Sequence, residues 1–485
     1  MKEYTKLNNI IGWIVGIAAS TVFIMTAEST ASFWDCGEFI ASAFKLEVGH
    51  PPGAPTFNLL GRIVSLLSFG NVQMVGVLIN YLSAVCSGLA VMFMFWITTY
   101  LARKFFIVKD ENEFTKGDMY AVFGAGVVGA MSFTFCDSFW FSAVEGEVYS
   151  MAAFFTSIIF WCATKWERDF DKNNSLRWII LVGFLIGLSV GVHLLNLLAI
   201  PAMGYIYYFK KHKATIKGVI FTTIISMAVT GLIMSLIIPG IVNLFGKFEL
   251  LFVNGFGLPF NSGTIIFTLL IIAVIVFGLK YTVKYKKPLT NALILAFTFL
   301  LFGYSTYLIL VIRSNANTPL NENAPKDAVS LLSYLNREQY GDWPVLYGQY
   351  YNSPLDSKNP YKDGSPYYTH DDKMGKYVIT DERKNSIPNY DPQFCTIFPR
   401  MWKSEKADEY KEWGDVKGIP ISSTAPDGET STIYKPTFGE NLTYFFRYQI
   451  AHMYFRYFMW NFVGRQNDVQ STGDPIDGNW MSGIT

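Results

Sequence analysis

The chain has 485 residues, of which 51% are hydrophobic and only 16% are charged, and its formal net charge is +1. Soluble domains usually carry about a quarter charged residues, so this composition argues against an ordinary soluble protein. A net charge near zero gives no support for a nucleic-acid partner. The aromatic content of 17% agrees with Trp, Tyr and Phe side chains at membrane interfaces.

Apolar runs recur along the first two thirds of the chain. A membrane span needs about 20 predominantly apolar residues, and nine runs approach that length, although the fifth and sixth are fused. The runs lie at about 8–27, 73–101, 118–135, 147–164, 176–193, 195–209, 217–239, 264–283 and 289–312. We therefore predict an α-helical polytopic membrane protein with about nine spans, whose first run is a retained helix and not a signal peptide.

Lys and Arg residues concentrate in alternate loops between these runs. One set of loops holds eighteen of them before the last span ends, and the other set holds three. Because basic loops mark the cytoplasmic side, the pattern predicts a multi-pass protein of the cell inner membrane with a cytoplasmic N-terminus. Cys36 and Cys136 both fall in predicted outer loops, so a disulfide between them stays open at this stage.

The composition changes after the last apolar run. Residues 314–440 are rich in Asn, Asp, Pro, Gly and Tyr and contain no spanning run. We predict a transmembrane domain over 1–313 and a mixed, loop-rich extracytoplasmic (periplasmic) region over 314–485. The elements expected in this second region are a helix around 324–339, a short strand around 377–380 and an amphipathic aromatic helix at about 441–463.

The first predicted outer loop carries most of the candidate chemistry. Asp35 and Glu38 lie three residues apart, and His50 opens a His-Pro-Pro-Gly turn. We expect a short helix, capped by Ser32 or Thr30, with both acids on one face. Close carboxylates raise one another's pKa, which suits a group that takes a proton near neutral pH. The alternative is a solvated loop helix with incidental acids.

Two further outer loops carry polar candidates between apolar flanks. The second offers Glu145 and Glu147 at the start of a span, where favourable interaction with the helix dipole is the alternative explanation. The third offers His193 and Asn196, where a packed, hydrogen-bonded histidine is the alternative. Because ionisable groups beside membrane spans are costly unless they are used or paired, we expect the three loops to share one cavity.

The sequence contains no P-loop, no Rossmann glycine fingerprint and no HExxH motif, so soluble-nucleotide chemistry is unsupported. Its acidic first loop followed by His-Pro-Pro resembles protein O-mannosyltransferases and the wider class of multi-span glycosyltransferases that use polyprenyl-phosphate sugars. Mannosyltransferases place their two acids adjacently, whereas two residues separate Asp35 from Glu38 here. The closer resemblance is to a bacterial branch, glycosyltransferase family 117, through Trp34-Asp35-Cys36-Gly37-Glu38, Gly49-His50-Pro51-Pro52-Gly53, Gly191-Val192-His193-Leu194-Leu195-Asn196 and the stretch from Tyr304 to Pro319.

The resemblance implies a GT-C-like fold and an inverting transfer without a covalent enzyme intermediate. By this resemblance a hexose such as mannose would pass from a polyprenyl-phosphate donor to a Ser/Thr hydroxyl of an exported protein at the outer face of the membrane. The implied partners are therefore the lipid-linked donor, the acceptor protein and membrane lipids. No cofactor is certain, and a divalent metal stays open. Members of this branch continue past the position of Thr485, so we expect the chain to be a truncated version.

Residue roles follow from the same resemblance. Asp35 is the expected general base on the acceptor hydroxyl, and Glu38 and His50 are expected to orient the acceptor or the donor. Basic side chains would offset the charge of the lipid phosphate. The expected catalytic residues are Asp35 and Glu38, and the expected substrate-binding residues are His50, Arg62, Glu145, Glu147, His193, Asn196 and Arg313, with Lys45 as a further basic candidate.

Two other functional classes stay open. A transporter or flippase for a lipid-linked or small polar substrate would also place acids and histidines among its spans. Such a protein usually holds charges at mid-membrane within repeated halves, whereas the acids here cluster at the outer ends of spans and no internal repeat is found. A non-catalytic subunit of an envelope assembly is the third alternative.

Overall fold

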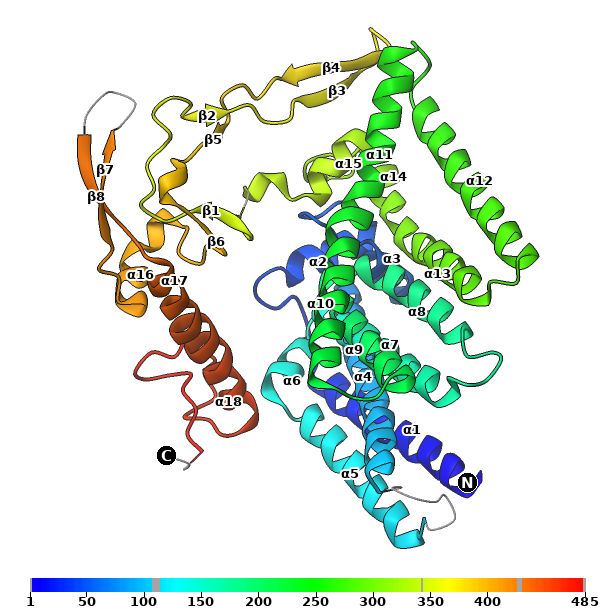
Figure 1. The fold of residues 1–485 in the computed structure, drawn as a ribbon. Helices are drawn as coiled ribbons and strands as arrows, with labels where there is room; N and C mark the ends of the chain where they lie inside the picture. Colours follow the sequence, from blue (N-terminus) through cyan, green and yellow to red (C-terminus); the bar gives the residue numbers. More distant parts are fainter. Residues whose placement is uncertain (1, 107–113, 342, 425–429, 483–485) are drawn as a thin grey trace. The chain divides into compact units, whose positions relative to one another are not determined.

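The computed structural model describes residues 2–106, 114–341, 343–424 and 430–482. The chain forms two compact units, Met1–Arg337 with Met374–Lys376, and Glu338–Lys373 with Tyr377–Thr485 (Figure 1). The first unit therefore extends beyond residue 313, the end of the predicted transmembrane domain. We describe each unit by itself.

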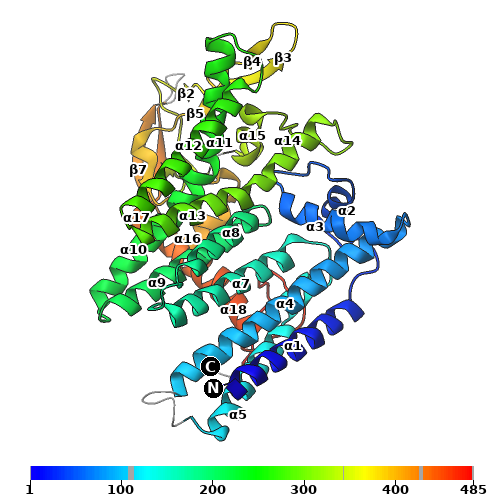
Figure 2. The ribbon, with the colours of Figure 1, turned by 90° about the vertical axis from the view of Figure 1, so that its right-hand side faces the viewer.

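The first unit is built from helices that pack against one another (Figure 2). Its helices are α1 (Lys2–Met25), α2 (Cys36–Lys45), α3 (Pro55–Ser65), η1 (Leu66–Ser68), α4 (Gln73–Phe106), α5 (Lys116–Thr134), α6 (Asp137–Ala143), α7 (Val148–Asp169), α8 (Arg177–Val190), η3 (Leu194–Leu198), α9 (Ala199–Lys211), α10 (Ile216–Leu232), η4 (Ile233–Ile237), α11 (Ile238–Leu250), η5 (Leu251–Gly255), α12 (Ser262–Lys284), α13 (Pro288–Tyr304), η6 (Ser305–Tyr307), α14 (Leu308–Asn315) and α15 (Ala328–Leu335).

Six of the helices in the described residues are long and apolar enough to cross a membrane, or seven if the bent pair α5 and α6 forms one span. These helices make the chain a multi-pass membrane protein, but the predicted count of nine spans is not confirmed. The runs expected at 176–193 and 195–209 form α8 and α9, of 14 and 13 residues. At about 1.5 Å per residue each is roughly 20 Å long, shorter than the ~30 Å hydrocarbon core.

The apolar run predicted at 217–239 is only the first part of a longer helix. α10, η4, α11 and η5 continue from Ile216 to Gly255 without a break. Glu249, buried near the end of this helix, accepts hydrogen bonds from the backbone nitrogen atoms of Asn261 (2.5 Å) and Thr264 (2.9 Å). Its carboxylate thus satisfies the first N–H groups of α12 and stabilises the turn between the two helices.

Glycines let α8 and α13 approach very closely. A Cβ atom at Gly183 or Gly187 would collide with the backbone of α13, and one at Gly303 would collide with the backbone of α8. Small residues four apart on a helix allow this kind of backbone contact between membrane helices. The pair joins a continuous apolar core that also includes side chains of α2, α3, α4 and α7.

The second unit is rich in loops and short hairpins. Its strands form antiparallel pairs, and its small core consists of Tyr350, Met401, Tyr410 and Tyr444. Its elements are η7 (Glu338–Tyr340), β1 (Tyr347–Gln349), β2 (Tyr361–Lys362), β3 (Tyr367–Asp371), β4 (Lys376–Asp381), β5 (Ile387–Pro388), η8 (Pro392–Phe394), β6 (Cys395–Ile397), η9 (Ser404–Lys406), α16 (Ala407–Gly414), β7 (Ile419–Thr424), β8 (Thr430–Lys435), α17 (Phe438–Tyr444), η10 (Phe445–Arg456) and α18 (Tyr457–Phe462). Strand pairs are β1–β6, β2–β5, β3–β4 and β7–β8.

Three local predictions for the region after residue 313 can be compared with these elements. The strand around 377–380 is confirmed as β4, and the aromatic helix at about 441–463 is confirmed as α17, η10 and α18. Its central part is a π-helix, which the sequence did not predict. The helix expected over 324–339 is shorter, because Asp327 caps it and α15 begins at Ala328.

The glycine contact between α8 and α13 yields a stability prediction. Gly187→Ala adds one methyl group against the backbone of α13, so we expect a loss of about 1–3 kcal/mol in the free energy of unfolding, measured as a lower Tm in detergent. Gly231→Ala on α10 is the matched control, since no atom lies within 4 Å of a Cβ there. A Tm for Gly187→Ala at or above that of the control would contradict the prediction.

Candidate functional site

The first loop places Asp35 directly before α2. Trp34 adopts a φ of 62° and turns the chain, and Asp35 occupies the N-cap position without a side-chain capping bond. The expected capping by Ser32 or Thr30 is therefore wrong, because α2 begins only at Cys36. Asp35 is exposed, so its carboxylate is accessible to a substrate.

Glu38 and His50 form a hydrogen-bonded pair. Glu38 Oε1 lies 2.9 Å from His50 Nδ1 and accepts a second hydrogen bond, of 2.7 Å, from the backbone nitrogen of His50. Gly49 is required here, because a Cβ atom would collide with Glu38 Oε1. The His-Pro-Pro-Gly turn closes through a hydrogen bond from Gly53 N to His50 O of 2.9 Å.

The pairing of Glu38 with His50 shifts both titrations. Burial raises the pKa of Glu38, but the hydrogen bonds from His50 outweigh it and the pKa falls below its usual value. The hydrogen bond to Glu38 raises the pKa of His50 despite burial, and the charges of Asp35 and Glu322 act in the same direction. The pair is therefore favoured in its charged form.

The region after the last long span holds this loop in place. The hydroxyl of Tyr334, on α15, donates to the carbonyl oxygen atoms of Gly49 (2.7 Å) and His50 (3.3 Å). Val48 pairs with Asn321 as in a parallel β-bridge. Sequence analysis did not find Tyr334, because one tyrosine among 28 carries no signal for a contact almost 300 positions away.

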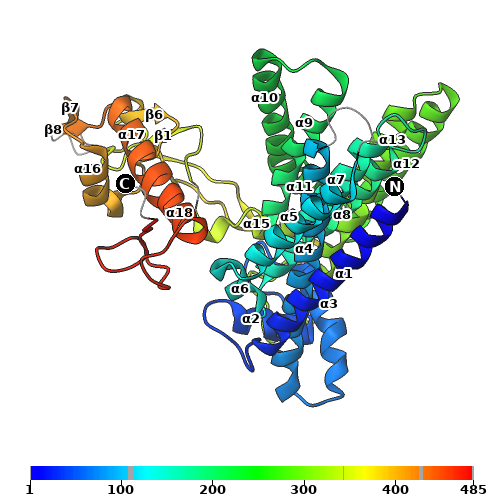
Figure 3. The same cartoon turned by 90° about the horizontal axis from the view of Figure 1, so that it is seen from below.

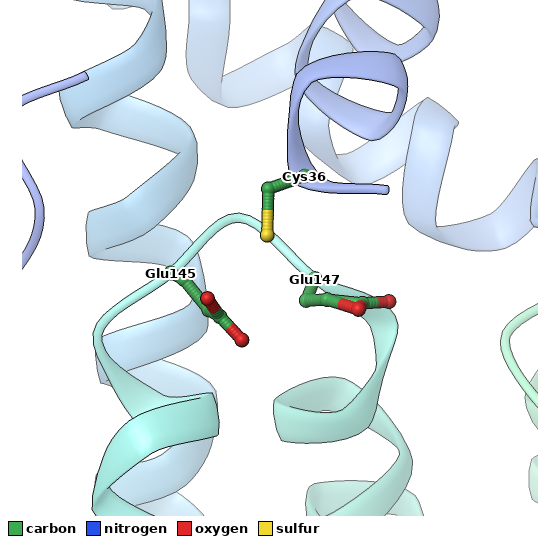
Figure 4. Close-up of side chains that lie close together, drawn as sticks. All are labelled: Cys36, Glu145 and Glu147. Atoms are coloured by element: carbon green, nitrogen blue, oxygen red, sulfur yellow. The ribbon is translucent and has the colours of Figure 1, made fainter. Parts of the chain in front are cut away.

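A thiol and two carboxylates form a buried cluster beside this loop (Figure 4). Cys36, Glu145 and Glu147 each offer one ligand atom, and these atoms all lie within 4.8 Å of one another. Glu145 lies in the loop before α7, and Glu147 caps that helix by accepting a 3.2 Å hydrogen bond from Val148 N. Capping, the alternative explanation for Glu147, is thus part of its role, but capping does not explain Glu145 or Cys36.

Burial dominates the electrostatics of this cluster. It raises the pKa of the Cys36 thiol to about 12 and the pKa of Glu147 to about 7, and neighbouring acids add to both shifts. It also raises the pKa of Glu145, although hydrogen bonds from Ser32 and Cys36 lower it in part. A carboxylate with a pKa near 7 can take and release a proton at neutral pH. The same three groups are of the types that hold a divalent cation.

The structure gives Cys36 a different role from the disulfide that the sequence left open. Cys36 and Cys136 are not bridged, and the thiol of Cys36 faces Glu145 and Glu147. Its place inside the Asp-Cys-Gly-Glu segment was the available signal, because the residue after an N-cap enters the first turn of the helix.

The two predicted arginines both contact the far end of α2. Arg62 donates to Phe44 O (2.6 Å), and Arg313 donates to Leu46 O (2.7 Å) and Lys45 O (3.0 Å). Cations at the C-terminus of a helix satisfy its last carbonyl groups and interact favourably with its dipole. These contacts give both arginines a structural role, and their contact with a lipid phosphate stays a prediction.

His193 and Asn196 lie in the short turn after α8. His193 Nδ1 accepts a hydrogen bond from Leu195 N (3.1 Å), and its ring lies 5.5 Å from that of Tyr149. Burial and the charge of Arg337 lower the pKa of His193, which favours its neutral form. Asn196 is buried and accepts from Thr156 Oγ1 (2.6 Å). Tyr149, at the start of α7, thus connects this turn with Glu147, and sequence analysis missed it.

The first two of the three loops that the sequence predicts to be outer therefore meet at one place. The charges of Asp35 and His50 both act on the carboxylate of Glu147, and Cys36 contacts the second loop. The third loop adjoins through Tyr149. Arg62 and Arg313 lie apart, at the opposite end of α2. The arrangement combines an exposed carboxylate, a charged carboxylate–imidazole pair and a buried acid that titrates near neutrality.

The Glu38–His50 pair yields a prediction about pH. Because the pKa of His50 is raised in the folded protein, His50 stabilises the fold below its ordinary pKa, and this stabilisation is lost as the pH rises through the raised pKa. Because the pKa of Glu38 is lowered, Glu38 stabilises the fold above its ordinary pKa, and this stabilisation is lost as the pH falls through the lowered pKa. The pair should stabilise most between about pH 4.3 and 6.5, the two ordinary values. We expect Glu38→Gln to lower the Tm more at pH 6 than at pH 8.5.

The control for that experiment is the same substitution in a His50→Gln background. There the pH dependence of the loss should disappear, because the group that Glu38 stabilises is gone. A loss from Glu38→Gln that is equal at both pH values in the parent protein would show that the charged pair does not form.

Comparison with known proteins now adds to this geometry. A family model, the Protein O-mannosyl-transferase TMEM260 N-terminal domain, matches residues 35–216, and a family of unknown function, DUF8416, matches residues 341–446. The chain is 26% identical to Protein O-mannosyl-transferase tmem260 of Dictyostelium discoideum over 37% of this chain and 20% of that relative. It is 24% identical to Protein O-mannosyl-transferase TMEM260 of Mus musculus over 36% of this chain and 22% of that relative.

The matches thus span about a fifth of the length of these curated relatives. No solved structure matches the chain. The segment that resembles the O-mannosyl-transferase domain begins at Asp35 and ends at Ile216. It therefore contains Asp35, Cys36, Glu38, His50, Glu145, Glu147, His193 and Asn196, but not Ser32, which bonds Glu145.

Proposed function

We propose that the chain is a membrane glycosyltransferase that moves a hexose such as mannose from a polyprenyl-phosphate donor to a Ser/Thr hydroxyl of an exported protein. One observation carries the proposal: the segment similar to the O-mannosyl-transferase domain, residues 35–216, contains the whole cluster of acids and histidines. A GT-C-like fold, membership of glycosyltransferase family 117 and reaction at the outer face of an inner membrane are finer parts of the same proposal.

The proposed reaction is a single displacement at the anomeric carbon. The acceptor oxygen forms a bond to this carbon while the bond from the carbon to the phosphate oxygen breaks, and the polyprenyl phosphate leaves with the electron pair. The hydroxyl proton passes to a carboxylate. Attack opposite the leaving group inverts the configuration of the sugar.

Asp35 is the proposed general base. Its carboxylate is exposed and is not occupied by capping α2, so an acceptor hydroxyl can approach within hydrogen-bond distance. Glu38 holds His50 in a fixed orientation, and the charged imidazole can donate to the acceptor or to the donor phosphate. Glu147 is the second candidate for the base, since burial raises its pKa to about 7.

The donor is the first testable part of this proposal. We expect the purified protein to transfer sugar from a polyprenyl-phosphate hexose to a Ser/Thr-containing peptide, because the described site offers carboxylates and the chain has no nucleotide-binding motif. The assay measures radiolabelled sugar on the peptide, with the matching nucleotide sugar as the comparison donor. Transfer from the nucleotide sugar without any lipid would contradict the proposal.

The base is tested by comparing two isosteric substitutions. Asp35→Asn keeps the size of the side chain and removes its basicity, so we expect transfer to fall about 10²- to 10⁴-fold with donor binding largely kept. Asp171→Asn, an exposed residue in the loop after α7, is the matched control and should leave the rate unchanged. We expect Glu38→Gln to lose less than Asp35→Asn, and His50→Ala to weaken mainly substrate binding.

The pH profile distinguishes the two candidate bases. If Asp35→Asn turns over within threefold of the parent, Asp35 is not the base. Glu147 as the base would give a rate that rises through about pH 7, its pKa, and Glu147→Gln would remove that rise together with the activity.

A further inference from the structure

A cavity of about 430 Å³ lies between α1, α4 and α7, away from the acid cluster. These three helices run side by side (Figures 2 and 3). Glu147 precedes the first residue of α7, whereas Lys165 and Arg168, which line the cavity, lie near its last residue. At about 1.5 Å per residue, roughly 27 Å of helix separates Glu147 from Lys165. The cavity is therefore distinct from the proposed transferase site.

Positive charge predominates around this cavity. Four cations line it: Arg103, Lys104, Lys165 and Arg168. Among the ion pairs of the described residues, Lys104 is paired with Glu167 and Arg168 with Asp169. Asp169 is shared, because it also pairs with Lys172 (2.8 Å) and Arg177 (3.5 Å). Among the described residues, the five cations Lys104, Lys165, Arg168, Lys172 and Arg177 thus share two carboxylates, Glu167 and Asp169.

Lys165 has no ion-pair partner among the described residues. Its ammonium lies 4.7 Å from the centre of the Trp161 ring, and the side chain is half-buried. Within the described part of the chain no carboxylate lies within 4 Å of it in an ion pair. A ring face attracts a cation but does not neutralise it, and a partly buried charge is costly without a counter-charge.

Polar and aromatic groups complete the lining. The side-chain oxygen of Asn8 is buried without a hydrogen-bond partner among the described residues, so it can accept a hydrogen bond from a protonated phosphate or from a headgroup hydroxyl. Trp96 Nε1 donates to Asn8 O (3.1 Å), which fixes this turn of α1. Arg103 lies with its guanidinium 4.9 Å from the centre of the Tyr4 ring.

We propose that this cavity binds a phosphate-bearing anion, either the headgroup of an anionic phospholipid or a free phosphate. Guanidinium and ammonium groups bind phosphate oxygen atoms through charge-assisted hydrogen bonds, and the volume suits a small group. Basic residues at the C-terminal ends of α4 and α7 also interact favourably with the helix dipoles. That interaction needs only exposed side chains, so it does not account for the half-buried Lys165 or for the orphan amide of Asn8.

The experiment uses the delipidated full-length protein in detergent. Native mass spectrometry measures the binding of phosphatidylglycerol, with zwitterionic phosphatidylcholine as the comparison lipid. We expect phosphatidylglycerol to bind at least about tenfold more tightly, and Arg103→Gln/Lys165→Gln to lose that difference, since the variant removes two groups that can make charge-assisted hydrogen bonds to phosphate. Lys210→Gln/Lys211→Gln, two exposed cations at the end of α9, is the control with the same change in charge.

A second arm distinguishes the two sources of phosphate. Inorganic phosphate should raise the Tm of the parent and not that of the double variant if a free anion suffices, whereas binding of phosphatidylglycerol alone identifies a lipid headgroup. Lys165→Gln alone repeats both arms in case the double variant does not fold. Equal binding of the two lipids together with no effect of phosphate would overturn the proposal, as would unchanged binding by the variants. None of these readouts depends on sugar transfer.

Discussion

The buried hydroxyl of Tyr334 bonds the carbonyl of Gly49, and the geometry of the site depends on this contact. Gly49 precedes His50, and the direction of His50 fixes Glu38 through two hydrogen bonds. A tyrosine hydroxyl inside an apolar core must find an acceptor, because an unsatisfied polar group there costs about 1–3 kcal/mol. The loop between α2 and α3 is therefore held by contacts with the protein interior and not by its own sequence alone. These contacts fix the positions of Glu38 and His50.

Burial then determines the pKa values of the groups beside this loop. Asp35, at the surface, remains available to solvent, whereas burial keeps the proton on Cys36, raises the pKa of Glu145 and brings the pKa of Glu147 to about 7. The carboxylates of Asp35 and Glu147 thus differ in their surroundings, and such a difference is a common way to separate acid and base functions in one site. The cavity at the other end of α7 shows the opposite balance, with cations in excess.

Much of the fold could be predicted from the sequence, because apolar runs and their length follow directly from the need to satisfy backbone groups in a membrane. The helices at each run were predictable for this reason. The number of spans was not, because hydropathy alone does not show where Gly191 to Leu198 leave the α-helix, nor that one helix continues from Ile216 to Gly255. The extra length of that helix includes charged residues, which a hydropathy window treats as a loop.

The candidate site was predictable to a similar extent. Asp35, Glu38, His50, Glu145 and Glu147 were identified from acids and histidine beside apolar flanks, and the structure brings them together. The position of Cys36 in the first turn of α2 follows from its place after the N-cap, but the sequence does not show that its thiol faces Glu145 and Glu147. The contacts of the arginines were not predictable for a physical reason. Arg62 and Arg313 donate to carbonyl groups at the end of α2, and a sequence does not show which side chain satisfies the last carbonyl groups of a helix.

The shortness of α8 has a consequence for the depth of the site. A helix of 14 residues leaves about 10 Å of the hydrocarbon core uncrossed, and irregular backbone is tolerated at that depth only where protein shields it. The turn after α8 meets this condition: Thr56 bonds the carbonyl oxygen atoms of Leu188 and Gly191, and Tyr307 bonds that of Val190. If α8 begins at one surface of the bilayer, the turn beside His193 lies below the opposite headgroup layer, and on the proposed function a lipid-borne phosphate would reach this turn while its tail stays in the bilayer.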